Sequence, residues 1–132
     1  MKVLITGANG FVGRNLVAHF GERTADEVVC FTRDNSVNDL PALLQGVDFV
    51  FHLASINRPQ DPSEFTTGNV DLTQALCAAI AASGCKIPVA YTSSSQAGLE
   101  NPYGASKRGA EEALSRLAAE HGVPVHLFRL PN

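Results

Sequence analysis

Tyr103 and Lys107 are four positions apart at the start of a segment with helical periodicity. Residues at i and i+4 share one face of a helix, so the two side chains should lie together. A nearby ammonium favours an ionised phenol, which makes Tyr103 a candidate acid or base for a carbonyl or an alcohol. Ser94, at the end of an expected strand, would hydrogen-bond the substrate oxygen where charge develops. Ser93 is the alternative if the serine register differs by one.

A glycine-rich turn near the start of the chain predicts a phosphate site. Gly7, Gly10 and Gly13 follow the apolar run Val3-Leu4-Ile5 and open a helical pattern. A helix N-terminus offers unpaired N–H groups and a positive dipole end, and glycine lets a pyrophosphate approach closely. The spacing is one residue longer than G-x-G-x-x-G, and an ordinary strand-to-helix turn is the alternative. The position after an apolar strand favours dinucleotide binding.

The tip of the second expected strand, residues 27–31, bears on the choice of dinucleotide. In such a fold the tip faces the adenosine ribose, where an acidic residue binds the 2′-hydroxyl and an arginine accommodates a 2′-phosphate. Arg33 therefore favours NADP(H), with NAD(H) as the alternative because Asp34 lies beside it. A solvated loop charge is the other interpretation of Arg33.

The periodicity of the chain predicts the elements that position these residues. We expect strands near 3–5, 27–31, 49–54, 88–92 and 123–129, and helices near 12–20, 38–46, 64–83 and 103–121. Residues 34–39 leave no room for another strand and crossover. The prediction is an α/β fold with a Rossmann-type, doubly wound parallel sheet of about five strands ordered 2-1-3-4-5. The loop 55–63 should flank the site at the carboxyl end of the third strand.

Composition limits the partners and the compartment. The 132 residues, 45% hydrophobic and 17% charged, suit one globular domain. A net charge of -3 without basic clusters argues against nucleic acid. No apolar run reaches membrane-span length and Met1-Lys2 leads directly into a strand, so we expect a cytoplasmic protein with no membrane partner. Cys30, Cys77 and Cys85 are odd in number and lack Cys-x-x-Cys spacing, which predicts reduced thiols. The histidines are scattered along the sequence, so we expect no metal site.

Together these segments resemble the extended, sugar-nucleotide-modifying branch of the short-chain dehydrogenase/reductase superfamily. The matching motifs are Thr6-Gly7-x-x-Gly10-x-x-Gly13, Phe51-His52-Leu53-Ala54, Gly68-Asn69-Val70, Thr92-Ser93-Ser94 and Tyr103-Gly104-x-Ser106-Lys107. They span nearly the whole chain. Residues 53–59 and 93–104 are most similar to reductases of capsular polysaccharide synthesis, which use NADPH on a 4-keto UDP-sugar. The resemblance implies a nucleotide-sugar reductase or epimerase.

The resemblance also implies a role for each matching residue. Ser94, Tyr103 and Lys107 would be catalytic, and Arg58 and Asn132 would contact the substrate. The residues expected to bind the cofactor are Gly7, Asn9, Gly10, Phe11, Val12, Gly13, Arg33, Leu53, Ala54, Ser55, Asn69, Tyr103 and Lys107.

Members of this branch continue beyond the position of Asn132 into a substrate-binding region. We therefore expect residues 1–132 to be a single NADP(H)-binding domain, truncated before that region, at the N-terminus of a longer enzyme. A dinucleotide sensor without catalysis is the alternative. The resemblance further implies a homodimer through the two long helices, which could also serve as an assembly surface.

Overall fold

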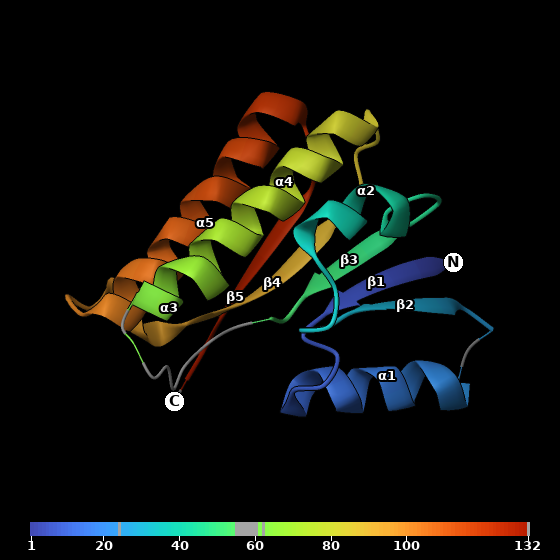
Figure 1. Ribbon diagram of the computed structural model, residues 1–132, viewed down its shortest axis with the longest axis horizontal. Coiled ribbons are helices and arrows are strands. Elements are labelled where there is room, and N and C mark those ends of the chain that lie inside the picture. The colour runs from blue at the N-terminus through green and yellow to red at the C-terminus, as the bar shows by residue number, and fades with distance from the viewer. Residues whose placement is uncertain (24, 55–60, 62, 132) are drawn as a thin grey trace.

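The chain folds as a parallel β-sheet with helices on both faces (Figure 1). The structure is a computed structural model and describes residues 1–23, 25–54, 61 and 63–131. The strands are β1 (Lys2–Thr6), β2 (Glu27–Phe31), β3 (Phe49–His52), β4 (Val89–Ser94) and β5 (Val125–Leu130). The helices are α1 (Phe11–Arg23), α2 (Leu40–Leu43), α3 (Ser63–Phe65), α4 (Leu72–Ser83) and α5 (Pro102–His121). Short turns precede α2 (η1, Val37–Asp39), α4 (η2, Thr66–Asp71) and α5 (η3, Ser95–Gly98).

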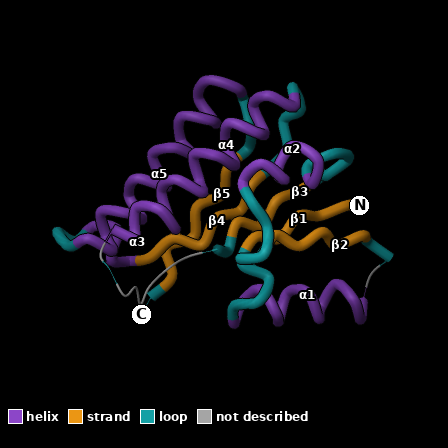
Figure 2. The backbone as a smooth tube through the Cα atoms, viewed as in Figure 1, coloured by secondary structure: helices purple, strands orange, loops and turns teal. Residues whose placement is uncertain are grey.

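The strands are ordered β2-β1-β3-β4-β5 and every neighbouring pair is parallel. This confirms the predicted Rossmann-type sheet and its order. Parallel neighbours require crossovers, and the helices that make them cover the two faces of the sheet. Helix α1 lies on one face under β1 and β2, whereas α2, α4 and α5 lie on the other (Figures 1 and 2).

Two hydrophobic clusters hold the helices to the sheet. The larger cluster, on the α4 and α5 face, includes Leu4, Val50, Leu76 and Leu114. The smaller one packs Val3, Ile5, Ala8 and Phe20 between the sheet and α1. Alternate residues of β1 point to opposite faces, so this strand contributes to both clusters. Apolar burial on both faces explains why β1 has a continuous apolar sequence.

The last strand is exposed compared with the rest of the sheet. Leu127, Phe128 and Leu130 are 39%, 54% and 42% exposed, whereas the apolar residues of β1 are fully buried. Strand β5 lies at the edge of the sheet and pairs with β4 alone among the described strands.

The predicted helix 64–83 is present but not regular. Its middle, η2, is a π-helical segment that carries Asn69, and α4 begins only at Leu72. The hydroxyl of Thr73 donates to the carbonyl of Asn69 at 2.6 Å, which gives that carbonyl a side-chain partner where the helix widens. The predicted helix 38–46 is also shorter, because the capping box of Ser36 and Asp39 begins a 3-10 turn before α2.

The glycine turn brings backbones into direct contact. A Cβ on Gly13 would lie 2.1 Å from the carbonyl oxygen of Gly7. Gly7 has φ of 72°, and a Cβ there would lie 2.6 Å from the nitrogen of Ala54. No side chain fits at either position, so α1 starts directly on the ends of β1 and β3.

We expect Gly13→Ala to destabilise the fold by about 1–3 kcal/mol, because the added methyl group must displace backbone. Gly21→Ala is the matched control in the same helix, since a Cβ at Gly21 meets nothing within 4 Å. That change should stabilise by about 0.5–1 kcal/mol through helix propensity. Urea unfolding of both variants measures the difference. Equal stabilities would contradict the packing described here.

Candidate active site

A hollow of about 650 Å³ opens beside the glycine turn, at the carboxyl ends of the strands. Gly7, Asn9 and Gly10 form one wall, and Leu53 and Ala54 form another. Helix α1 begins at Phe11, so the first N–H groups of this helix lie next to the hollow. The arrangement suits a pyrophosphate, because the turn offers backbone donors and its glycines have no Cβ to keep an anion away.

The ribose-facing side of the hollow comes from the segment after β2. Thr32, Arg33, Asp34, Asn35 and Val37 line it, and Arg33 and Asp34 are exposed. The N–H of Thr32 donates to the side chain of Asn35 at 2.9 Å, which folds the segment into a tight turn. Both charged residues that bear on the choice of dinucleotide therefore border the same hollow.

A buried chain of hydrogen bonds runs under the hollow from β1 to η2. The hydroxyl of Thr6 accepts the N–H groups of Leu53 and Ala54, each at 3.1 Å, so its own hydrogen is left for Nδ1 of His52 at 2.6 Å. His52 then carries its proton on Nε2 and donates to the hydroxyl of Thr73 at 2.8 Å. Burial and the charge of Lys107 lower the pKa of His52 to about 3. The imidazole is therefore neutral at physiological pH.

Asn69 connects this chain of bonds to the start of α5. Its carbonyl accepts the hydroxyl of Thr73, and its Nδ2 donates to Oγ of Ser106 at 2.9 Å. Ser106 donates to the carbonyl of Tyr103 at 2.7 Å. Gly68, directly before Asn69, lines the hollow. The hollow and the tyrosine are thus linked through a few directly bonded residues.

Lys107 is almost completely buried beneath this link, with 2% of its surface exposed. Its Nζ donates to the carbonyl of Thr92 at 3.1 Å and lies 5.0 Å and 5.9 Å from the ring centroids of Tyr91 and Tyr103. Burial lowers the pKa of Lys107 to about 8, and the carboxylate of Glu111 opposes that shift. The structure brings Tyr103 and Lys107 together, as their spacing predicted.

The two candidate serines differ in what their hydroxyl hydrogens do. Ser93 donates to Oε2 of Glu111 at 2.5 Å, so its hydrogen points toward α5. Ser94 accepts the N–H of Gln96 at 3.1 Å and caps η3, and within the described residues no acceptor takes its own hydrogen. This difference supports Ser94 as the donor to a substrate oxygen.

The remaining predicted site residues fall in two groups. Phe11 and Val12 are exposed at the start of α1, beside the hollow but not among its lining residues. Ser55, Arg58 and Asn132 lie outside the described residues. Residues that the sequence analysis did not name as site residues also line the hollow, namely Phe31, Thr32, Asn35, Val37, Gly68 and Leu72.

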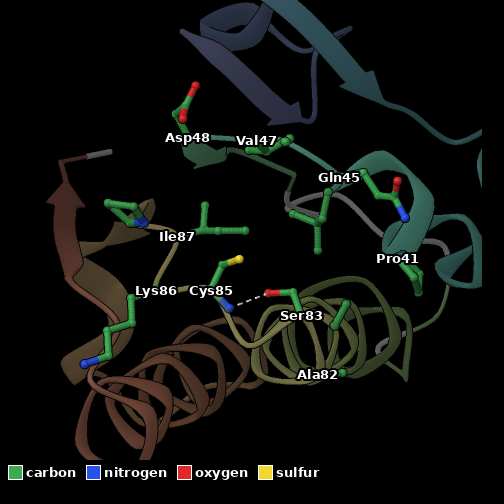
Figure 3. A pocket seen from close by; sticks show the side chains of 13 residues that line it. Pro41, Gln45, Val47, Asp48, Ala82, Ser83, Cys85, Lys86 and Ile87 are labelled. Carbon is green, nitrogen blue, oxygen red and sulfur yellow. Dashed lines mark hydrogen bonds between the residues drawn. The ribbon is translucent and has the colours of Figure 1, made fainter.

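A second hollow, of about 740 Å³, lies at the opposite, amino ends of β3 and β4 (Figure 3). Its wall includes Pro41, Val47, Cys85 and Ile87, and the N–H of Cys85 donates to Oγ of Ser83 at 3.1 Å. None of the predicted site residues lines it. Over the described part of the chain, no helix has both the length and the apolar character needed to cross a membrane.

Comparison with known proteins identifies the family and the fold of the chain. Over all 132 residues the chain is 60% identical to the UDP-2-acetamido-2,6-beta-L-arabino-hexul-4-ose reductase of Pseudomonas aeruginosa, and it spans 36% of that protein. The crystal structure of capsular polysaccharide assembling protein CapF from Staphylococcus aureus is 37% identical with a TM-score of 0.85, and the chain again covers 36% of it. A UDP-glucuronic acid 4-epimerase from Bacillus cereus in complex with NAD shares the fold, with a TM-score of 0.85 at 23% identity over 57% of its length.

The chain thus spans about a third of the length of the reductase and of CapF. The family model of the NAD dependent epimerases and dehydratases matches residues 3–132, which is nearly the whole chain. With the glycine turn, the hollow beside it and the paired Tyr103 and Lys107 in place, this chain belongs to the NAD dependent epimerase/dehydratase family.

Proposed function

We propose that this chain is the NADP(H)-binding domain of a longer reductase that acts on the 4-keto group of a UDP-sugar in capsular or surface polysaccharide synthesis. The observation that carries the proposal is the bonded link from the hollow through Asn69 and Ser106 to Tyr103. It joins a site for a dinucleotide to a site for proton transfer. The relative named as a hexul-4-ose reductase supports the substrate class.

The proposed chemistry divides between the bound dinucleotide and the protein. When bound, the dinucleotide would supply the hydride for the carbonyl carbon. Tyr103 would donate its phenolic proton to the carbonyl oxygen, and Ser94 would donate a hydrogen bond to the same atom. Lys107, anchored on the carbonyl of Thr92, would keep a positive charge beside the phenol and contact the nicotinamide ribose.

The proposed cofactor contacts follow the walls of the hollow. The turn from Gly7 to Gly13 would hold the pyrophosphate, Arg33 would hold the 2′-phosphate, and Leu53 and Ala54 would line the cleft. Ser55 as a cofactor contact, and Arg58 and Asn132 as substrate contacts, remain predictions. We propose a cytoplasmic protein whose partners are the nucleotide sugar and a second copy of the chain.

A dinucleotide sensor without catalysis is the second candidate. A sensor needs only the hollow. The chain spans only 36% of the reductase and of CapF, so it matches only part of each protein. The buried ammonium between Tyr91 and Tyr103 argues for the enzyme, because sensing a dinucleotide requires no lysine beside a phenol.

The first test is the choice of cofactor. NADPH should bind more tightly than NADH, because a charge-assisted hydrogen bond from Arg33 contributes about 1.5–3 kcal/mol, or roughly ten- to hundredfold in affinity. Arg33→Ala should lose this preference in fluorescence titrations. Arg116→Ala, an exposed arginine on α5 outside the hollow, should keep it. Equal affinities of the unchanged chain for the two cofactors would refute the assignment to Arg33.

The second test is turnover. The 132-residue chain should bind NADPH but reduce 4-keto sugar nucleotides far more slowly than about one per second, because an open half-site orients the substrate poorly. A longer form that includes the region matching the rest of the reductase should be active. In that form, Tyr103→Phe should lower kcat by about 10²–10⁴ while NADPH still binds.

Rapid NADPH oxidation by the 132-residue chain with such a substrate would show that the chain needs no further region. A longer form that binds NADPH but reduces none of a panel of 4-keto sugar nucleotides would favour the sensor.

The third test concerns the dimer. The groove between α4 and α5 includes Ala78, Ala81 and Ala113 among longer polar side chains, and the exposed Ala78 leaves space for a second copy to approach. Light scattering should detect a dimer that Ala78→Glu converts to a monomer. Ala18→Glu, the same change on the exposed side of α1, should leave the dimer intact. A monomer at high concentration of the unchanged chain would refute this proposal.

A further inference from the structure

We propose that Glu111 is a positioning residue of this site, which fixes the end of β4 where Ser94 lies and places a carboxylate beside Lys107. The inference rests on the proposed function for the roles of Ser94 and Lys107. Neither the spacing of Tyr103 and Lys107 nor the glycine turn assigns a role to Glu111. Its hydrogen bonds to β4 and β5 do.

The carboxylate of Glu111 is held by two partners. Arg129 donates from Nε to Oε2 at 3.0 Å and from Nη2 to Oε1 at 2.8 Å, which is a bidentate pair. Ser93 donates to Oε2 at 2.5 Å. Glu111 is only 9% exposed, and its pKa is held low chiefly by the hydrogen bonds from Arg129. The group is therefore a fixed, buried negative charge.

These bonds join α5 to two strands at one level of the sheet. Ser93 and Arg129 are register partners in β4 and β5, so the carboxylate of Glu111 bridges the strands where β4 is about to end. Ser94 is the next residue and caps η3. The backbone of η3 in turn touches α5, because a Cβ on Gly104 would lie 2.2 Å from the carbonyl oxygen of Gln96.

It follows that loss of the hydrogen bond from Ser93 to Glu111 would loosen the end of β4, which sets the position of Ser94. The same loss would loosen the packing of η3 on the first turn of α5, which carries Tyr103. Glu111 thus acts on Ser94 and Tyr103 through the backbone and not by contact with the substrate.

Glu111 also acts on Lys107 through its charge. It lies one helical turn after Lys107, on the same face of α5. The other titratable groups near Lys107 are neutral His52 on β3, Tyr91 on β4 and Tyr103 on α5, while Arg129 on β5 lies behind the carboxylate. Burial disfavours the ammonium, and Glu111 offsets part of that penalty.

The test follows the ionisation of Lys107 by NMR in the 132-residue chain labelled at lysine Cε. The chain has three lysines, so Lys2 and Lys86 serve as internal references and Lys107→Met identifies the third signal. Glu111→Gln should lower the titration midpoint of Lys107 by about one pH unit, or tenfold in its ionisation constant. Glu112→Gln, which removes the adjacent exposed carboxylate, should leave that midpoint unchanged.

Arg129→Met provides a variant with the opposite expected sign. Arg129 is exposed, and its removal leaves the charge of Glu111 without its counter-ion, so the Lys107 midpoint should rise. A purely structural role for Glu111 would lower the melting temperature in both variants without opposite shifts. An unchanged Lys107 midpoint in folded Glu111→Gln would overturn the proposal. If Glu111→Gln does not fold, an unchanged Lys107 midpoint in Arg129→Met would overturn it.

The titration is independent of sugar reduction. If the longer form reduces no 4-keto sugar nucleotide while Lys107 shifts as expected, the proposed function fails and the electrostatic role of Glu111 stands. In an active longer form, Glu111→Gln should lower kcat and move the alkaline limb of its pH profile to lower pH.

Discussion

The close contact of backbones beneath the glycine turn is the constraint on which the rest of the site depends. Gly13 lies against Gly7, and Gly7 lies against the chain at Leu53 and Ala54, with no space for one more carbon atom at either contact. Side chains can change rotamer, whereas a contact between backbones leaves few alternatives. The start of α1 and the ends of β1 and β3 therefore form one rigid unit, and this unit lines the hollow proposed for the dinucleotide.

Polar groups in the core extend this rigidity toward α5. A buried histidine or lysine is unfavourable unless its polar atoms have partners, and here both ring nitrogens of His52 and the ammonium of Lys107 have them. Each bond joins elements far apart in the sequence, so the polar groups also fix how those elements meet. The π-helical segment η2 belongs to the same arrangement, since it presents Asn69 to Ser106 and to Thr73 at once.

Much of the fold was predictable because its signals are local. Apolar runs, helical spacing and the glycines of the first turn indicated all five strands and their order. The irregularity of η2 was not predictable, because it accompanies a bond between Thr73 and a backbone carbonyl that competes with regular helix geometry. The pairing of Glu111 with Arg129 also left no local signal, since the two residues meet only once β5 has joined the sheet. Residue type could not decide between Ser93 and Ser94, because only the folded structure shows that Ser93 donates to Glu111 while Ser94 accepts from Gln96.

The central place of β1 in the sheet has a consequence for the order of folding. Lys2 pairs with Glu27 and Val3 pairs with Phe49, so β1 lies between two strands that follow it in the chain and are synthesised after it. Contacts so distant in sequence carry a large loop-closure entropy, and parallel sheets built from them form slowly. Until β3 emerges, one edge of β1, whose centre is the apolar run Val3-Leu4-Ile5, stays open to other chains. Slow synthesis between β1 and β3 would therefore favour misassembly more than slow synthesis between β4 and β5.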